Sequence, residues 1–159
     1  MRNLKLRLAM LDDQPVIAEL GDIAALARQY GPLVFRVAWR ILGSRAGAED
    51  VQQQLFLRLL EKPPAAVQSW QAYLVASASR LAIDHLRRQR RWRLLAPMWR
   101  SDDPEDSPSN DAERAEGARF MRRALARLNP RDAACFVMRH LHALTPAAIG
   151  TAMQMEEQS

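Results

Sequence analysis

The sequence is poor in cysteine, in lysine and in long apolar runs. Cys135 is the single cysteine among 159 residues, so an internal disulfide is impossible and a secreted, disulfide-stabilised fold is excluded. No apolar run approaches the roughly 20 residues that a membrane-spanning helix needs. We therefore expect a cytoplasmic protein of one or two small domains.

The sequence also lacks the residue patterns of an enzyme or a metal protein. His85, His140 and His142 have no partners at metal-ligand spacing, and there is no glycine-rich loop that could hold a phosphate. Glu49 and Asp50 lie in the first turn of an expected helix, where acids favour the helix dipole without forming a catalytic pair. We predict no catalytic residue, no metal ion, no cofactor and no small-molecule substrate.

Positive charge is abundant, and nearly all of it is arginine. The chain has 23 basic and 18 acidic residues, a formal net charge of +5, and Lys5 and Lys62 are its two lysines. The planar guanidinium suits phosphates and base edges, so nucleic acid is a plausible class of partner. A coding sequence rich in G and C would produce the same arginine bias.

The spacing of apolar residues predicts an all-α fold. No segment alternates with a period of two, whereas apolar side chains recur every three or four residues along most of the chain. Gly31 and Pro32 interrupt the first stripe, where we expect a kink or two consecutive helices. A turn at Gln154 and Met155 is expected to end the last helix. The predicted helical stripes cover 22–42, 48–62, 70–91, 118–128, 130–141 and 146–153.

An acidic segment is expected to divide the chain. Residues 101–110 combine serines, acids, Pro104 and Pro108, a composition that cannot bury enough apolar surface to fold and is typical of a flexible linker. The predicted organisation is an N-terminal tail at 1–21, a helical domain at 22–96, a linker at 97–112 and a second helical domain at 113–159.

Two segments carry the pattern of nucleic-acid binding. The helices around His142, Ala143 and Leu144 outline a helix-turn-helix, although short helical hairpins also serve packing alone. The stretch 87–100 holds six arginines and no acid, interleaved with Trp92 and Trp99. Such a stretch offers charge for phosphates and rings for stacking unpaired bases, and a solvated charged helix face is the alternative.

Three stretches taken in order carry a family resemblance. They are YGPLVFRVAWRILGSRAGAEDVQQQLFLRLLEK at 30–62, SWQAYLVASASRLAIDHLRRQRR at 69–91 and ALARLNPRDAACFVMRHLHALTPAAIGTAM at 124–153. They resemble regions 2.1 and 2.2, regions 2.3 and 2.4, and the first part of region 4 of the extracytoplasmic-function (ECF) group of bacterial RNA polymerase sigma factors. The ordered succession of the three is more specific than any one of them.

The resemblance implies a set of partners and a polymerase-binding helix. The partners are core RNA polymerase, through its beta-prime clamp and beta flap, promoter DNA and an anti-sigma factor. The helix from Ala48 to Arg58 would dock on the beta-prime clamp. Gln54 stands where the family usually has an acid. The implied core-polymerase-binding residues are Asp50, Gln53, Gln54, Phe56 and Arg58.

The resemblance also implies that 70–91 faces the minus-ten promoter element. Arg80 stands where many relatives carry asparagine, and Tyr73 where many carry tryptophan. For Asp84, a local salt bridge with Arg80 or Arg88 is the alternative to a role in DNA binding. The implied DNA-binding residues are Trp70, Tyr73, Ser77, Arg80, Asp84, Arg87, Arg88 and Arg91.

The end of the sequence departs from the family. Relatives continue into a recognition helix that reads the minus-thirty-five element, whereas here only Glu156 to Ser159 follow the expected turn. Gln154 also replaces the turn glycine that is common in the family. The second domain is thus expected to lack its recognition helix.

The resulting hypothesis is an ECF-type sigma factor that binds core polymerase, directs promoter recognition and melts the minus-ten element without covalent chemistry. Two alternatives remain open at this point. One is a helical protein-interaction module, and the other is a DNA-binding regulator that acts without polymerase and would bind promoter duplex alone.

Overall fold

The computed structural model describes residues 20–95 and 112–157, and these residues form helices joined by short loops. No strand occurs in these two ranges, and the predicted all-α class is confirmed. Nearly all of the predicted tail and linker, with Trp99, lies outside the described residues. The helices are α2 (Leu20–Leu42), α3 (Arg45–Glu61), α4 (Trp70–Leu95), α5 (Ala112–Leu125), α6 (Pro130–His140) and α7 (Pro146–Glu157).

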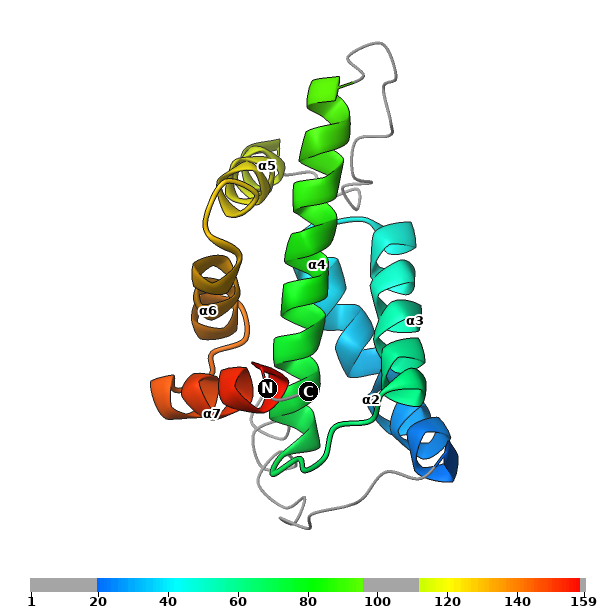
Figure 1. Ribbon diagram of the computed structural model, residues 1–159. Coiled ribbons are helices and arrows are strands. Elements are labelled where there is room, and N and C mark those ends of the chain that lie inside the picture. The colour runs from blue at the N-terminus through cyan, green and yellow to red at the C-terminus, as the bar shows by residue number, and fades with distance from the viewer. Residues whose placement is uncertain (1–19, 96–111, 158–159) are drawn as a thin grey trace.

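Helix α4 is the longest of these helices and lies at the centre of the arrangement. Helices α2 and α3 pack against one side of α4, and α6 and α7 pack against its other side, with α5 near its C-terminal end (Figure 1). None of the described helices is long and apolar enough to cross a membrane.

Side-chain caps fix the start of four helices. In each case a side-chain oxygen accepts a hydrogen bond from a backbone N–H of the first turn, which would otherwise have no partner inside the helix. The bonds run from Gly47 N to Ser44 Oγ at 3.2 Å, from Ala72 N to Ser69 Oγ at 3.3 Å, from Arg131 N to Asn129 Oδ1 at 2.9 Å and from Ala148 N to Thr145 Oγ1 at 3.1 Å.

Of the two alternatives predicted at Pro32, a kink or two consecutive helices, the second is wrong, because α2 continues through Pro32 as one helix. Proline removes one backbone hydrogen bond and crowds the preceding turn. Here the apolar faces on both sides of Pro32 enter the same core, with Leu26 before it and Val34 after it both buried. Packing of the two faces outweighs the local penalty.

The expected turn at Gln154 and Met155 is also wrong, since α7 runs to Glu157. Neither residue is glycine or proline, and methionine, glutamine and glutamate are all good helix formers. Helix α4 likewise extends beyond its predicted end at Arg91 to Leu95.

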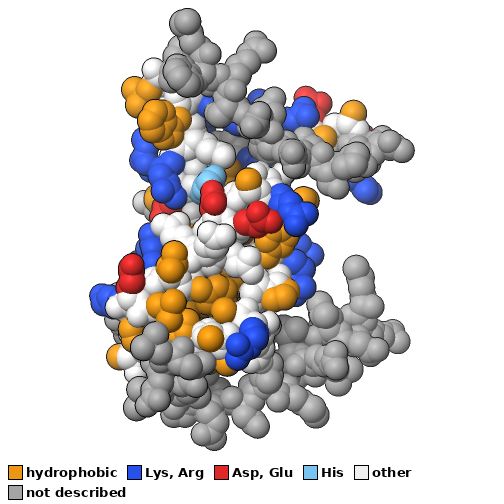
Figure 2. All heavy atoms as spheres, turned by 90° about the vertical axis from the view of Figure 1, so that its right-hand side faces the viewer, with side chains coloured by type: hydrophobic (Ala, Val, Ile, Leu, Met, Phe, Trp, Pro, Cys, Tyr) orange, Lys and Arg blue, Asp and Glu red, His pale blue; other side chains and the backbone are white. Residues whose placement is uncertain are grey.

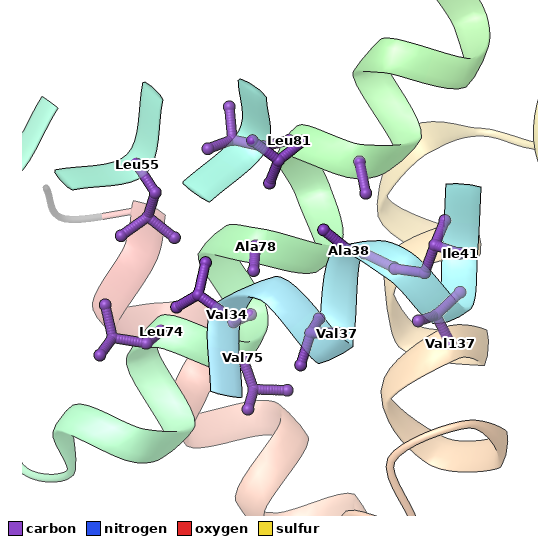
Figure 3. Packing of buried hydrophobic residues seen from close by; sticks show 14 of the residues in the cluster. Val34, Val37, Ala38, Ile41, Leu55, Leu74, Val75, Ala78, Leu81 and Val137 are labelled. Atoms are coloured by element: carbon purple, nitrogen blue, oxygen red, sulfur yellow. The ribbon is translucent and has the colours of Figure 1, made fainter. Parts of the chain in front are cut away.

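One hydrophobic cluster joins the two halves of the chain. Val34 and Ile41 of α2, Leu74 of α4 and Val137 of α6 are all completely buried. Ile41 and Val137, which are 96 positions apart in the sequence, both belong to this cluster (Figure 3). The described helices of both halves thus share one core. The division into domains at 22–96 and 113–159 stays a prediction.

Polar contacts also tie the second half of the chain to the first. Arg40 Nη1 of α2 donates a hydrogen bond to the Leu141 carbonyl at 2.9 Å, just after α6. Gly43 ends α2 at a φ of 63°, and the Arg122 guanidinium of α5 lies against its Cα, where a Cβ would collide with it. Glycine therefore serves two purposes at this position: it adopts the left-handed backbone, and it leaves space for an arginine.

Candidate polymerase and nucleic-acid interface

The residues predicted to bind polymerase lie on α3, outside its buried stripe. Val51, Leu55 and Leu59 turn inward and are buried, so the positions between them point outward. Asp50, Gln53 and Arg58 are exposed and Gln54 is half-buried. Phe56 is half-buried and packs against the hydrophobic cluster.

The outer face around α3 mixes charges of both signs. Acidic and basic side chains are interspersed around an uncharged polar area, and hydrophobic side chains gather toward one end (Figure 2). A face of this composition is typical of a protein-binding surface as well as of ordinary solvated surface.

The residues predicted to bind DNA follow one face of α4. Tyr73, Ser77, Asp84, Arg88 and Arg91 recur at steps of three, four or seven residues, which places them along one side of a helix. Exposure increases along this side: Tyr73 and Ser77 are buried near the start of α4, whereas Asp84, Arg88 and Arg91 are exposed toward its end. Trp70, Arg80 and Arg87 are half-buried.

A groove between α3 and α4 brings the two predicted sets together. Gln54 and Arg58 line its α3 wall, and Leu81 lies at its α4 side. The remaining lining residues, all from α4, are Asp84, Arg87, Arg88 and Arg91. We call this feature the α3–α4 groove. Residues assigned separately to polymerase and to DNA thus lie within one depression of the surface.

A second groove continues the first toward the start of α4. It is lined by Tyr73 and Ser77 and shares Arg58 and Leu81 with the α3–α4 groove, so the two are contiguous. We call it the Tyr73 groove. The Trp70 ring meets the Tyr73 ring edge-on, with 5.8 Å between the ring centroids.

The hydroxyl of Ser77 is unusual within this groove. Its Oγ is buried and has no hydrogen-bond partner among the described residues, whereas Ser79 Oγ, also buried, donates to the Val75 carbonyl at 2.7 Å. A buried polar atom without a partner costs free energy in the folded chain. A ligand atom that enters the groove could supply the missing bond.

Two further lining residues were not predicted from the sequence. Glu61 and Lys62 belong to the α3 wall of the Tyr73 groove. They follow Arg58 by three and four positions, so helical spacing from Arg58 is the signal that would have found them.

The α3 and α4 walls are also coupled electrostatically near His85. Burial lowers the pKa of His85, Arg88 lowers it further, and Asp50 of α3 acts in the opposite direction. Gln89 Nε2 lies 3.2 Å from His85 Nε2. The neutral imidazole is therefore favoured between the two walls.

Asp84 is exposed on α4, one turn before Arg88. Within the described part of the chain, no ion pair is found between Asp84 and Arg88. Arg87 is engaged elsewhere, because its Nη1 donates to the Leu128 carbonyl at 2.8 Å, between α5 and α6. Arg88 and Arg91 are the more exposed of the α4 arginines that line the α3–α4 groove.

No metal centre accompanies these grooves in the ranges that the structure covers. The described residues contain no group of three or more histidine, cysteine, aspartate or glutamate side chains that could hold an ion. Cys135 is partly buried and packs against the hydrophobic cluster, as a small apolar side chain would.

Comparison with known proteins relates the chain to transcription factors. Residues 26–92 match the sigma-70 region 2 family, a segment that includes α3 and most of α4. The ECF RNA polymerase sigma factor BldN of Streptomyces coelicolor is 29% identical over 149 residues, which cover 88% of this chain and 56% of BldN.

Two relatives come from Mycobacterium tuberculosis. SigI, named a probable ECF RNA polymerase sigma factor, is 29% identical over 144 residues, which cover 85% of this chain and 49% of SigI. SigL, named an ECF RNA polymerase sigma factor, is 27% identical over 143 residues, which cover 88% of this chain and 81% of SigL. The chain spans about half the length of BldN and SigI.

These names agree with the prediction of a transcription protein that performs no covalent chemistry, since they describe sigma factors and not enzymes. The resemblance seen in the sequence is confirmed: residues 26–92 match the sigma-70 region 2 family, and the chain is similar to ECF RNA polymerase sigma factors over 85% to 88% of its length.

Proposed function

We propose that the chain is a sigma factor that binds core RNA polymerase in the cytoplasm, directs it to promoters and melts the minus-ten element. The observation that carries the proposal is the pair of contiguous grooves, where residues implied in polymerase binding and residues implied in DNA binding lie together. Contacts with the beta flap and control by an anti-sigma factor belong to the same proposal and rest on the resemblance alone.

The outer face of α3 supports the polymerase half of the proposal. Its inner residues are fixed in the core, so the helix is rigid, and Asp50 and Gln53 are presented outward on a regular scaffold. A rigid polar face binds a partner at a low entropic cost. Asp50 is the acidic side chain among the residues implied in this contact.

Charge reversal at Asp50 tests the polymerase contact. We expect Asp50→Lys to weaken binding to core polymerase at least about 10-fold, because a like-charge contact within an interface costs several kcal/mol. The matched control is Glu116→Lys, the same reversal at an exposed position of α5. Binding is measured by titrating fluorescently labelled chain with core enzyme. Equal affinities of the two variants would refute the assignment of this face.

The Tyr73 groove supports the DNA half of the proposal. Promoter melting exposes bases, and proteins hold such bases in pockets with aromatic rings and a few hydrogen bonds. This groove offers the Tyr73 side chain, the buried Ser77 hydroxyl without a partner and, at its rim, Arg58 and Lys62. A base inside it would complete the hydrogen bonding of Ser77.

A pair of serine variants tests this role. Ser77→Ala removes the hydroxyl without breaking a bond in the folded chain, whereas Ser79→Ala removes the bond to Val75 and serves as the control. We expect polymerase assembled with the Ser77→Ala chain to bind single-stranded DNA of random sequence about 5-fold more weakly in a filter-binding assay. One lost hydrogen bond of about 1 kcal/mol accounts for a change of this size. If Ser77→Ala binds this DNA as tightly as wild type, the Tyr73 groove does not hold an unpaired base.

The arginines of the α3–α4 groove are proposed to hold phosphates of the same DNA. Replacing Arg88 and Arg91 by alanine should weaken holoenzyme binding to DNA and lower the slope of log K against log salt by about 1.4 to 1.8, since two phosphate contacts are lost. An unchanged slope would show that neither side chain contacts a phosphate.

A further inference from the structure

A second arginine-rich groove lies between the C-terminal half of α4 and α5, and no residue of it lines the grooves described above. We call it the α4–α5 groove. No acid is found among the described residues that line it. Its arginines come from both walls and from the turn after α5: Arg90, Arg93, Arg119, Arg122, Arg123 and Arg127.

One of these arginines has a structural position that accounts for it. The Arg122 guanidinium packs against Gly43 at the C-terminal end of α2, where a cation is favoured by the helix dipole. Arg90, Arg93, Arg123 and Arg127 are exposed side chains. Their mutual repulsion within one groove costs free energy that a bound polyanion would remove.

The apolar lining of the groove narrows the choice of polyanion. Leu86, Leu94 and Ala126 line it together with the arginines, and Leu94 is 69% exposed. If an inorganic anion or the backbone of a duplex were bound, this apolar surface would stay exposed to water. A strand with unpaired bases can place phosphates on the arginines and the flat faces of bases on the leucines.

The spacing of the charges also favours a nucleic-acid strand over an acidic peptide. Arg119 and Arg123 are one helical turn apart, about 6 Å along α5, and Arg90 and Arg93 face them from α4. Regularly spaced phosphates are present in any nucleic-acid strand, whereas a peptide needs a particular arrangement of acids.

We propose that the α4–α5 groove is a second, sequence-independent site for single-stranded nucleic acid. It lies on a different side of α4 from the α3–α4 groove, because Arg90 and Arg93 line the one and Arg88 and Arg91 line the other. The inference extends the proposed function from one nucleic-acid site to two. It does not depend on polymerase binding and can be tested with the chain alone.

The test is the binding of a fluorescent oligothymidine to the full chain, followed by anisotropy over a range of salt concentrations. The groove variant combines Arg93→Gln and Arg123→Gln, one arginine from each wall. The control combines Arg28→Gln and Arg36→Gln, exposed arginines of α2 that remove the same net charge. We expect the groove variant to bind at least 5-fold more weakly, with a salt slope lower by about 1.4, and the control to bind within 2-fold of wild type.

A second variant distinguishes a loss of binding from a loss of folding. Leu94→Glu places an acid on the exposed apolar lining and should weaken oligothymidine binding by a similar factor while the far-ultraviolet circular dichroism stays that of the wild type. Equal losses in the groove variant and in the control, or no binding by the wild-type chain at low salt, would overturn the proposal.

Competitors identify the ligand class. Unlabelled oligothymidine should displace the fluorescent probe at a lower concentration of negative charges than tripolyphosphate, polyglutamate or duplex DNA requires. If polyglutamate competes as well as the oligonucleotide, the groove is an acidic-peptide site and the proposal is wrong. If duplex DNA competes as well, the requirement for unpaired bases is wrong. The core-polymerase affinity of the groove variant is measured separately, so failure here leaves the polymerase assignment standing, and the reverse also holds.

Discussion

Acid should destabilise this protein through His142, which lies in the turn between α6 and α7. Burial of the imidazole, and secondarily the nearby Arg40 guanidinium, lower the pKa of His142 from 6.5 to about 4. Its Nε2 is buried and has no hydrogen-bond partner among the described residues. Arg40 is itself held by its bond to the Leu141 carbonyl, so the cation cannot easily move away from the ring.

The direction and the size of the effect follow from this pKa. Between a pH of about 6.5 and about 4, the unfolded chain binds a proton at this histidine that the folded chain does not bind, so the free energy of unfolding falls as the pH decreases. Lowering the pH from about 7 to about 5 should therefore remove at most about 2 kcal/mol of stability through His142. The pKa of His85 is also lowered and acts in the same direction.

Urea denaturation near pH 7 and near pH 5 measures the effect. His142→Gln keeps a polar side chain in the turn but cannot titrate, and His140→Gln at an exposed position of α6 is the control. The loss of stability between the two pH values should be smaller in His142→Gln by up to about 2 kcal/mol and unchanged in the control. The same loss in wild type and His142→Gln would refute the burial of an uncharged imidazole.

Other substitutions test the packing, each by urea denaturation. Gly43→Ala should destabilise the chain by about 2 kcal/mol, because alanine is disfavoured at positive φ and its Cβ displaces Arg122; a neutral result would contradict that contact. Ala143→Gly should stabilise by up to about 1 kcal/mol, since Ala143 has a φ of 54°, and a loss of stability would contradict this backbone. Met138→Ala should cost about 2 to 5 kcal/mol because Met138 of α6 is fully buried; a cost near that of a surface substitution would mean that α6 does not pack on α4.

Local signals in the sequence predicted most of the helices. Ser44 and Ser69 are of a residue type common at helix N-caps, and their side chains accept first-turn N–H groups, because capping depends on residues within a single turn. The buried stripes of α3 and α4 followed from the helical period, and the buried residues Val51 and Leu81 lie where the period places them.

Features set by long-range packing could not be predicted. Pro32 has a local penalty that the sequence shows, whereas the compensating burial of Val34 depends on where α4 lies. The sequence also gives no sign that Arg122 will lie against Gly43, 79 positions earlier in the chain. Contacts between distant segments are fixed by the tertiary arrangement and leave no periodic signal.

The same distinction applies to the candidate sites. The family resemblance identified residues on α3 and α4, but their meeting in one groove depends on how α3 packs on α4. The α4–α5 groove was not predicted at all, because Arg93 and Arg123 come together only when α5 lies beside the end of α4. The arginine run after Arg87 indicated charge without indicating its partner helix.

Binding of the wild-type chain to a bacterial core RNA polymerase, measured by sedimentation velocity, tests the proposed sigma-factor function most directly. A one-to-one complex is expected at micromolar concentrations, with the labelled chain sedimenting with the polymerase. If the folded chain and the polymerase sediment separately at every ionic strength, the chain does not act as a sigma factor and the role assigned to the outer face of α3 is wrong.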